Sequence, residues 1–220
     1  MAVLAYAVAM GYLEAATVVY LRAALGLSSE LVGPGDDAMT GATVGAFLPA
    51  EVAREAATLV MIAAVGWLAG RRPLERLAWA AVVFGTWDIV YYAGLWTLIG
   101  WPPSLAAWDV LFLIPVPWVG PVLAPIGVSV ALVGFGLAVA GRLRAGGRLH
   151  LGPLHLAAAV AGGLLVVASF LVDGARVLAG DLAPWSGWPI YAGGMTLAVA
   201  ATVAAFDPDP GHDRDGRAPQ

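Results

Sequence analysis

Ionisable side chains that interrupt long apolar segments are the residues of this chain best suited to chemistry. Glu14 lies within the first apolar run, Arg54 and Glu55 lie near the start of the second, and Asp88 lies in the middle of the third. An ionisable group at membrane depth costs at least ~2.5 kcal/mol on insertion scales, so it usually has a buried partner and often a function. Carboxylates in such a setting can pair with arginine, hold a hard cation or exchange protons.

The spacing of polar residues places several of them on shared helix faces. Thr58 follows Arg54 by four residues, and Tyr91 and Tyr92 follow Asp88 by three and four. Residues three or four apart lie on one face of a helix. We therefore predict one ligand-binding set, which consists of Glu14, Arg54, Glu55, Asp88, Tyr91 and Tyr92.

Two more specific chemistries use subsets of these carboxylates. Asp88, Glu55 and Asp109 are the candidate acid–base groups of an intramembrane enzyme that cleaves a lipid or a peptide bond. Glu14, Glu55 and Asp88 are weak candidates for a site that holds a hard divalent cation. Neither subset has a specific motif, so no cofactor is predicted and enzymatic activity stays an open alternative. A third interpretation is that Arg54 forms a helix-locking ion pair and has no further role.

Composition indicates a membrane protein. Of 220 residues, 60% are hydrophobic and 12% are charged, whereas soluble domains have about 25% charged residues. Cysteine and lysine are absent, which excludes thiolate metal sites, disulfides and lysine Schiff bases. No basic stripe suits nucleic acid. The expected partners are membrane lipids and, in one alternative, other membrane subunits.

The apolar runs predict an all-α bundle of six transmembrane helices in a domain over residues 1–206. A span needs about 20 apolar residues, and six runs fit: Ala2–Arg22, Glu51–Gly70, Leu77–Gly100, Val119–Gly141, Pro153–Val172 and Trp188–Phe206. The apolar stretch near 104–114 is too short to span, and Ser104 is a suitable N-cap, so we predict a short interfacial or re-entrant helix there. Residues 207–220 are rich in Pro, Gly and Asp and predict a disordered acidic tail.

Arginine placement predicts the orientation in the membrane. Two connections carry the arginines Arg71, Arg72 and Arg76, and Arg142, Arg144 and Arg148. With six spans, both connections lie on the same side as the two termini, and the positive-inside rule makes that side cytoplasmic. The intramembrane charges then fall in the outer half, as one outward-opening polar pocket would require. The lysine-free, Ala/Gly/Arg-rich composition is typical of a GC-rich bacterium and hence of an inner membrane protein.

Three segments resemble a known family. Glu14–Arg22, Arg54–Met61 and Trp108–Pro125 are similar to segments of an uncharacterised family of small six-helix bacterial integral membrane proteins. The resemblance implies a membrane location and a shared polar core. That family has no assigned activity, so the resemblance implies no mechanism.

The leading functional hypothesis is a membrane protein that binds or processes a small ligand, an ion or a lipid headgroup at the polar site. One alternative is an accessory or structural subunit of a larger membrane complex. The other alternative is the acid–base enzyme that would use Asp88 and Glu55.

Overall fold

The computed structural model describes residues 1–24 and 42–206, most of which are helical. The predicted tail over 207–220 lies outside these residues. Five helices are long and apolar enough to cross a membrane, judged by length and composition, and a sixth apolar helix, α8, has only 17 residues. The elements are α1 (Ala2–Ala24), α3 (Ala42–Ala69), α4 (Pro73–Ile99), β1 (Trp108–Phe112), β2 (Trp118–Pro121), α5 (Leu123–Arg144), α6 (Pro153–Leu171), α7 (Gly174–Leu178) and α8 (Trp188–Ala204).

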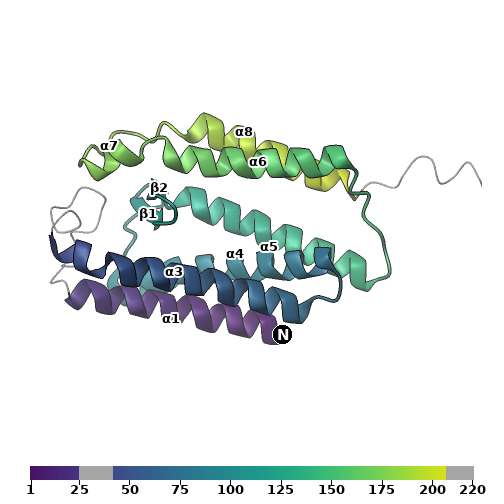
Figure 1. The fold of residues 1–220 in the computed structure, drawn as a ribbon, viewed down its shortest axis with the longest axis horizontal. Helices are drawn as coiled ribbons and strands as arrows, with labels where there is room; N and C mark the ends of the chain where they lie inside the picture. The colour runs from purple at the N-terminus through teal and green to yellow at the C-terminus, as the bar shows by residue number, and fades with distance from the viewer. Residues whose placement is uncertain (25–41, 207–220) are drawn as a thin grey trace, which may run out of the picture.

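Helix α4 is the centre of one group of helices. It packs against α1, α3 and α5, whereas α6 and α8 pack mainly against each other (Figure 1). The α6–α8 pair meets the rest of the protein where α6 contacts β2 and where α8 contacts α5. The C-terminal end of α8 and the N-terminus lie toward the same end of the bundle (Figure 1).

Small residues bring the helices of each group close together. Ala7, Gly11 and Ala15 recur every four residues along α1 and are buried. A Cβ at Gly11 would lie 2.6 Å from the carbonyl oxygen of Trp87, so only glycine allows this approach of α1 to α4. Close packing through small residues is typical of membrane helices, because lipid provides no hydrophobic drive for their association.

The predicted short helix near 104–114 is wrong, because this segment forms a β-hairpin. Strand β1 pairs antiparallel with β2, with Asp109 opposite Gly120 and Val110 opposite Val119. Strand β2 therefore includes residues 119–121, the first three residues of the predicted fourth span. Prolines at 102, 103, 115 and 117 flank β1, and proline disfavours the helical conformation of the preceding residue.

Several helix boundaries also differ from the predictions, and α4 begins at Pro73 instead of Leu77. Helix α3 begins at Ala42 instead of Glu51, so Pro49 lies inside the helix. Helix α5 begins at Leu123 because the residues before it belong to the hairpin. Pro49 is the eighth residue of α3, beyond the first turn, so its missing N–H removes one intrahelical hydrogen bond.

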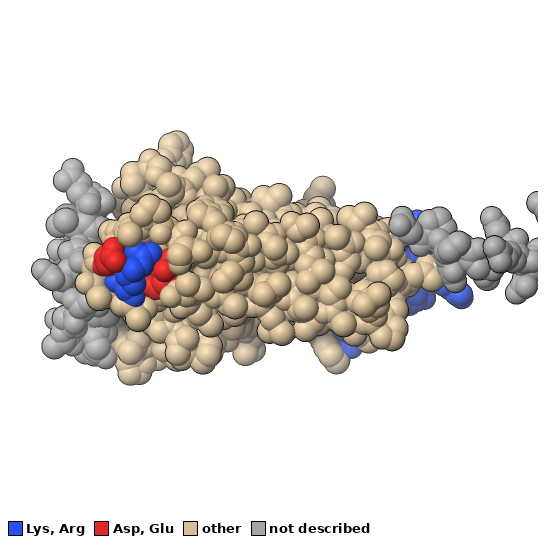
Figure 2. All heavy atoms as spheres, turned by 90° about the horizontal axis from the view of Figure 1, so that it is seen from above, with Lys and Arg blue, Asp and Glu red and all other residues tan. Residues whose placement is uncertain are grey.

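Charged groups lie at the two ends of the bundle surface. The face formed by α6 and α8 has acidic and basic groups at one end, basic groups at the other, and an uncharged band between them (Figure 2). At one end Arg176 pairs with Asp173 and Asp181, at 3.0 and 3.3 Å. A local ion-pair cluster thus follows the C-terminal end of the predicted fifth span. The Ser186 hydroxyl donates to Asp173 from the loop before α8.

Candidate functional site

The predicted ligand-binding residues all line one elongated cavity of about 850 Å³. Its walls come from α1, α3, α4 and the hairpin at one end, and from α4, α5, α6 and α8 along its length. We call the former region the polar end, because four carboxylates and one arginine line it: Glu14, Arg54, Glu55, Asp88 and Asp109. The rest of the wall is almost entirely apolar.

Arg54 joins α1 to α3 at the polar end. Its guanidinium forms an ion pair with Glu14 and a second with Glu51, which lies one turn earlier on the same helix. Arg54 Nη2 and Nε lie 2.8 and 3.0 Å from Glu51 Oε2. One arginine is therefore shared between two carboxylates.

Glu55 fixes the hairpin to α3. The backbone N–H of Leu113 donates to both carboxylate oxygens of Glu55, at 2.9 and 3.2 Å. Leu113 directly follows β1, and Glu55 is only 8% exposed. The carboxylate thus satisfies a backbone donor that has no partner in the ladder and holds the hairpin over the polar end.

Asp88 is bound by α5. Ser129 Oγ donates to Asp88 Oδ2 at 2.8 Å, and the Ser129 side chain is fully buried. Gly85, one turn before Asp88, permits this contact, because a Cβ there would meet the carbonyl oxygen of Ser129. Sequence reasoning missed Ser129, although it is the only polar side chain between Leu123 and Gly141.

Asp109 closes the polar end from the hairpin. Its Oδ2 accepts a hydrogen bond from the Tyr92 hydroxyl at 2.8 Å, and its Oδ1 accepts from the Val110 N–H at 2.9 Å. The residue keeps some exposed surface, but its carboxyl group is densely surrounded by protein atoms. This burial raises the pKa of Asp109 to about 6, although the hydrogen bond from Tyr92 and the charge of Arg22 oppose the shift.

Several cavity-lining groups have spare hydrogen-bonding capacity, and they include the buried ring nitrogens of Trp87, Trp118 and His155, which have no partner among the described residues. Asp88 Oδ1 has no donor among the described residues, and the hydroxyl groups of Thr58 and Tyr91 have no partner there either. Thr58 is 2% exposed and Asp88 is 8% exposed. Buried polar groups are normally hydrogen-bonded, so unpaired groups at a cavity wall indicate a ligand or ordered water.

The candidate catalytic and metal-binding subsets are not brought together as those chemistries would require. Within residues 1–24 and 42–206, no three Asp, Glu or His side chains gather closely enough to hold a metal ion. The weak metal set of Glu14, Glu55 and Asp88 is therefore not supported by the geometry. Asp88, Glu55 and Asp109 each accept from a different donor, and no hydrogen bond joins two of them in the described part of the chain.

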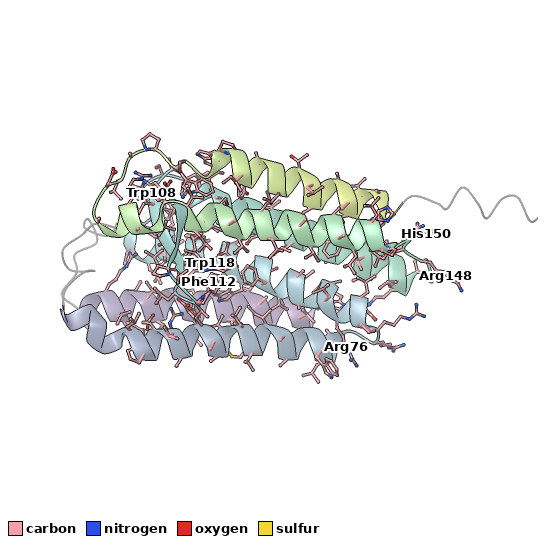
Figure 3. All side chains as sticks on the ribbon, turned by 45° about the horizontal axis from the view of Figure 1, so that its top comes forward. Arg76, Trp108, Phe112, Trp118, Arg148 and His150 are labelled. Atoms are coloured by element: carbon pink, nitrogen blue, oxygen red, sulfur yellow. The ribbon has the colours of Figure 1, made fainter. Side chains whose placement is uncertain are left out.

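A chain of aromatic rings links the two groups of helices beside the polar end. The hairpin contributes its central members, Phe112 and Trp118, whose ring centroids are 5.6 Å apart. Phe112 stacks on Phe84 of α4 with a centroid separation of 6.2 Å, and Trp118 stacks on Phe170 of α6 with a centroid separation of 6.4 Å. Phe112 and Trp118 lie on the side of the molecule opposite Arg76 and Arg148 (Figure 3). The hairpin thus joins both groups at one end and leaves the cavity between them.

Glu75, at the arginine-rich end, was missed by sequence reasoning. It is 6% exposed, accepts from the Arg71 N–H at 2.9 Å and pairs with Arg144 at 3.2 Å. Its position three residues after the Arg71-Arg72 pair was a usable signal. Because its contacts are all local to the ends of α4 and α5, this pair has a structural role in joining them.

Comparison with protein-family models, curated proteins and solved structures found no match to this chain. The resemblance to a family of small six-helix bacterial membrane proteins therefore stays a prediction. The functional argument depends on the site itself.

Proposed function

We propose that this chain is an integral membrane protein that binds the polar group of a small ligand at the polar end of its cavity. The observation that carries the proposal is that residues from α1, α3, α4 and the hairpin converge on a single cavity. Charged groups in a lipid environment are costly, and charges held for packing alone have no need to surround an open space. Unpaired polar groups at the same wall support a ligand further.

In this proposal the chain crosses the membrane six times, with α8 as the sixth pass. Helix α8 packs along α6, and at 1.5 Å per residue its 17 residues extend about 26 Å, close to the ~30 Å hydrocarbon core. The uncharged band between the charged ends supports this placement (Figure 2). Without α8 as a pass, the two termini would lie on opposite sides of the membrane.

The proposed orientation places the polar end toward the outer side of a bacterial inner membrane. Arg76, Arg148 and His150 all lie toward the end opposite the hairpin (Figure 3). The positive-inside rule makes that end cytoplasmic, together with both termini.

The enzyme alternative has less support than binding. A carboxylate pair that performs acid–base catalysis would share a proton or face a common substrate atom, whereas Asp88 and Asp109 are oriented by separate donors. No observation in the structure favours the accessory-subunit alternative specifically.

Native mass spectrometry of gently extracted protein tests the proposal. Wild type is compared with Asp88→Asn and with Asp181→Asn, a matched change outside the cavity. We expect a co-purified mass on wild type and Asp181→Asn, with at least tenfold lower occupancy on Asp88→Asn. Equal occupancy on all three proteins, or no bound mass, would contradict the proposal, and a co-purified polypeptide would favour the subunit alternative.

A further inference from the structure

The apolar length of the cavity carries information about the ligand beyond the polar end. The cavity wall includes Leu74 and Tyr92 of α4, which are about 27 Å apart along the helix at 1.5 Å per residue. That length exceeds half of the ~30 Å hydrocarbon core of a bilayer. Spread over that length, the 850 Å³ volume gives a mean cross-section of about 30 Å², so the space is long and narrow.

The cavity is also open sideways. Several residues that line it are largely exposed, including Leu77, Leu156 and Val160, at 59%, 60% and 53%, so this part of the wall is not covered by protein. In a membrane this surface faces acyl chains. A ligand with an apolar chain could therefore enter laterally from the bilayer without passing through water.

The charge balance at the polar end favours a cationic group. Arg54 is already shared between Glu14 and Glu51. The three remaining carboxylates at the polar end, Glu55, Asp88 and Asp109, accept hydrogen bonds only from uncharged donors. Arg54 and Arg22 act on Glu55 and Asp109 from beyond ion-pair distance, whereas no cationic side chain of the described residues acts on Asp88. Carboxylates out of water are stabilised by a cation that pairs with them.

The hydrogen-bonding groups and the rings suit an ammonium group in particular. An ammonium has three donors and no acceptor, and Asp88 Oδ1 and the Thr58 hydroxyl are both able to accept. Trp87, Tyr91 and Phe112 also line the polar end, and aromatic faces attract cations.

Building on the proposed function, we propose that the ligand is a single-chain amphiphile whose ammonium headgroup binds at the polar end and whose apolar chain lies along the cavity. The headgroup contacts Asp88 and Glu55. The chain passes between α4 and α5 on one side and the α6–α8 pair on the other.

Two glycines allow the chain part to be tested separately. Gly134 lines the cavity, Gly193 does not, and a Cβ added at either meets no atom within 4 Å. Gly134→Leu therefore adds a side chain at the cavity wall without a clash at its Cβ, and Gly193→Leu is the matched control. Gly163→Leu, a second cavity-lining change with an equally open Cβ position, replaces Gly134→Leu if that variant does not fold.

Binding of hexadecylamine, hexadecanol, hexadecanoate and butylamine to the full chain in phosphatidylcholine nanodiscs is then measured, with empty nanodiscs as background. We expect one hexadecylamine per chain, with at least tenfold weaker binding of the alcohol, the acid and the short amine. Asp88→Asn should weaken hexadecylamine at least tenfold. Gly134→Leu should do the same while leaving butylamine unchanged, and Gly193→Leu should match wild type.

Equal binding of alcohol and amine would overturn the ammonium assignment, and unchanged hexadecylamine binding in Gly134→Leu and Gly163→Leu would overturn the chain assignment. A water-soluble ligand that co-purifies with wild type, is lost in Asp88→Asn and persists in Gly134→Leu would leave the proposed function standing and refute this inference. If neither a co-purified ligand nor any probe binds wild type, both fail.

Discussion

The bond between Glu55 and the Leu113 N–H makes a sharp prediction about the hairpin. Glu55→Ala removes the only acceptor that the structure gives this backbone donor. A hydrogen bond to a charged group contributes about 1.5–3 kcal/mol. Local opening at Leu113 should become easier by that amount, so amide hydrogen exchange there should accelerate about 10- to 100-fold. Glu55→Gln keeps an uncharged acceptor and should accelerate it only about fivefold.

Hydrogen exchange resolved at the Leu113 amide is the assay, and two controls isolate the effect. The Val122 amide donates to the Ala107 carbonyl at 2.9 Å, independently of Glu55, and should keep its protection. Glu51→Ala makes a similar change one turn away on α3 and should leave Leu113 unaffected. The reasoning is refuted if Glu55→Ala leaves Leu113 exchange unchanged, or if Val122 accelerates equally, since the whole domain would then be opening.

Three further predictions concern pH, an ion pair and helix packing. The pKa of Asp109 in the folded protein is raised to about 6, above the ordinary value of 3.8, so protonation of Asp109 favours folding. The free energy of unfolding should therefore fall by about 1–3 kcal/mol between pH 4 and pH 6. Asp109→Asn should remove this pH dependence from denaturation curves. Glu75→Ala should lower the free energy of unfolding by about 1–3 kcal/mol, because Glu75 is buried. Arg144→Ala should lower it by less than about 1 kcal/mol, because the Arg144 side chain is 58% exposed. Equal losses for the two variants in chemical unfolding would contradict this prediction. Gly162→Ala should lower the free energy of unfolding by about 1–3 kcal/mol, because the added Cβ would lie 2.6 Å from a backbone nitrogen of α8. Gly163→Ala has free space at its Cβ and should be neutral or slightly stabilising. The melting temperatures of the two variants test this difference.

Periodicity and hydropathy predicted the long helices and the composition of the polar end. The stripe through Arg54, Glu55 and Thr58 and the stripe through Asp88 and Tyr91 do line the same cavity. This was predictable because a charge in an apolar helix must face other protein groups instead of lipid. Helix spacing then determines which residues share that face.

The partners of these residues were not predictable in the same way. The contact between Ser129 and Asp88 joins residues 41 positions apart, and that between Leu113 and Glu55 joins residues 58 apart. Both depend on how helices and the hairpin pack, which local patterns do not encode. The hairpin was missed for the same reason, since the strand that stabilises Trp108–Phe112 was assigned to the next helix.

The cavity itself argues that something apolar occupies it in the membrane. Core substitutions indicate a cost of about 24 cal/mol for each Å³ of empty space, so 850 Å³ left empty would cost on the order of 20 kcal/mol. That is an upper bound for a cavity open at its side, yet it exceeds the ~5–15 kcal/mol by which folded domains are stable. A hydrocarbon chain supplied by the bilayer removes this cost along the apolar length. It does nothing for the carboxylates of Glu55, Asp88 and Asp109 at the polar end, so in the proposed complex these carboxylates are left for the headgroup to bind.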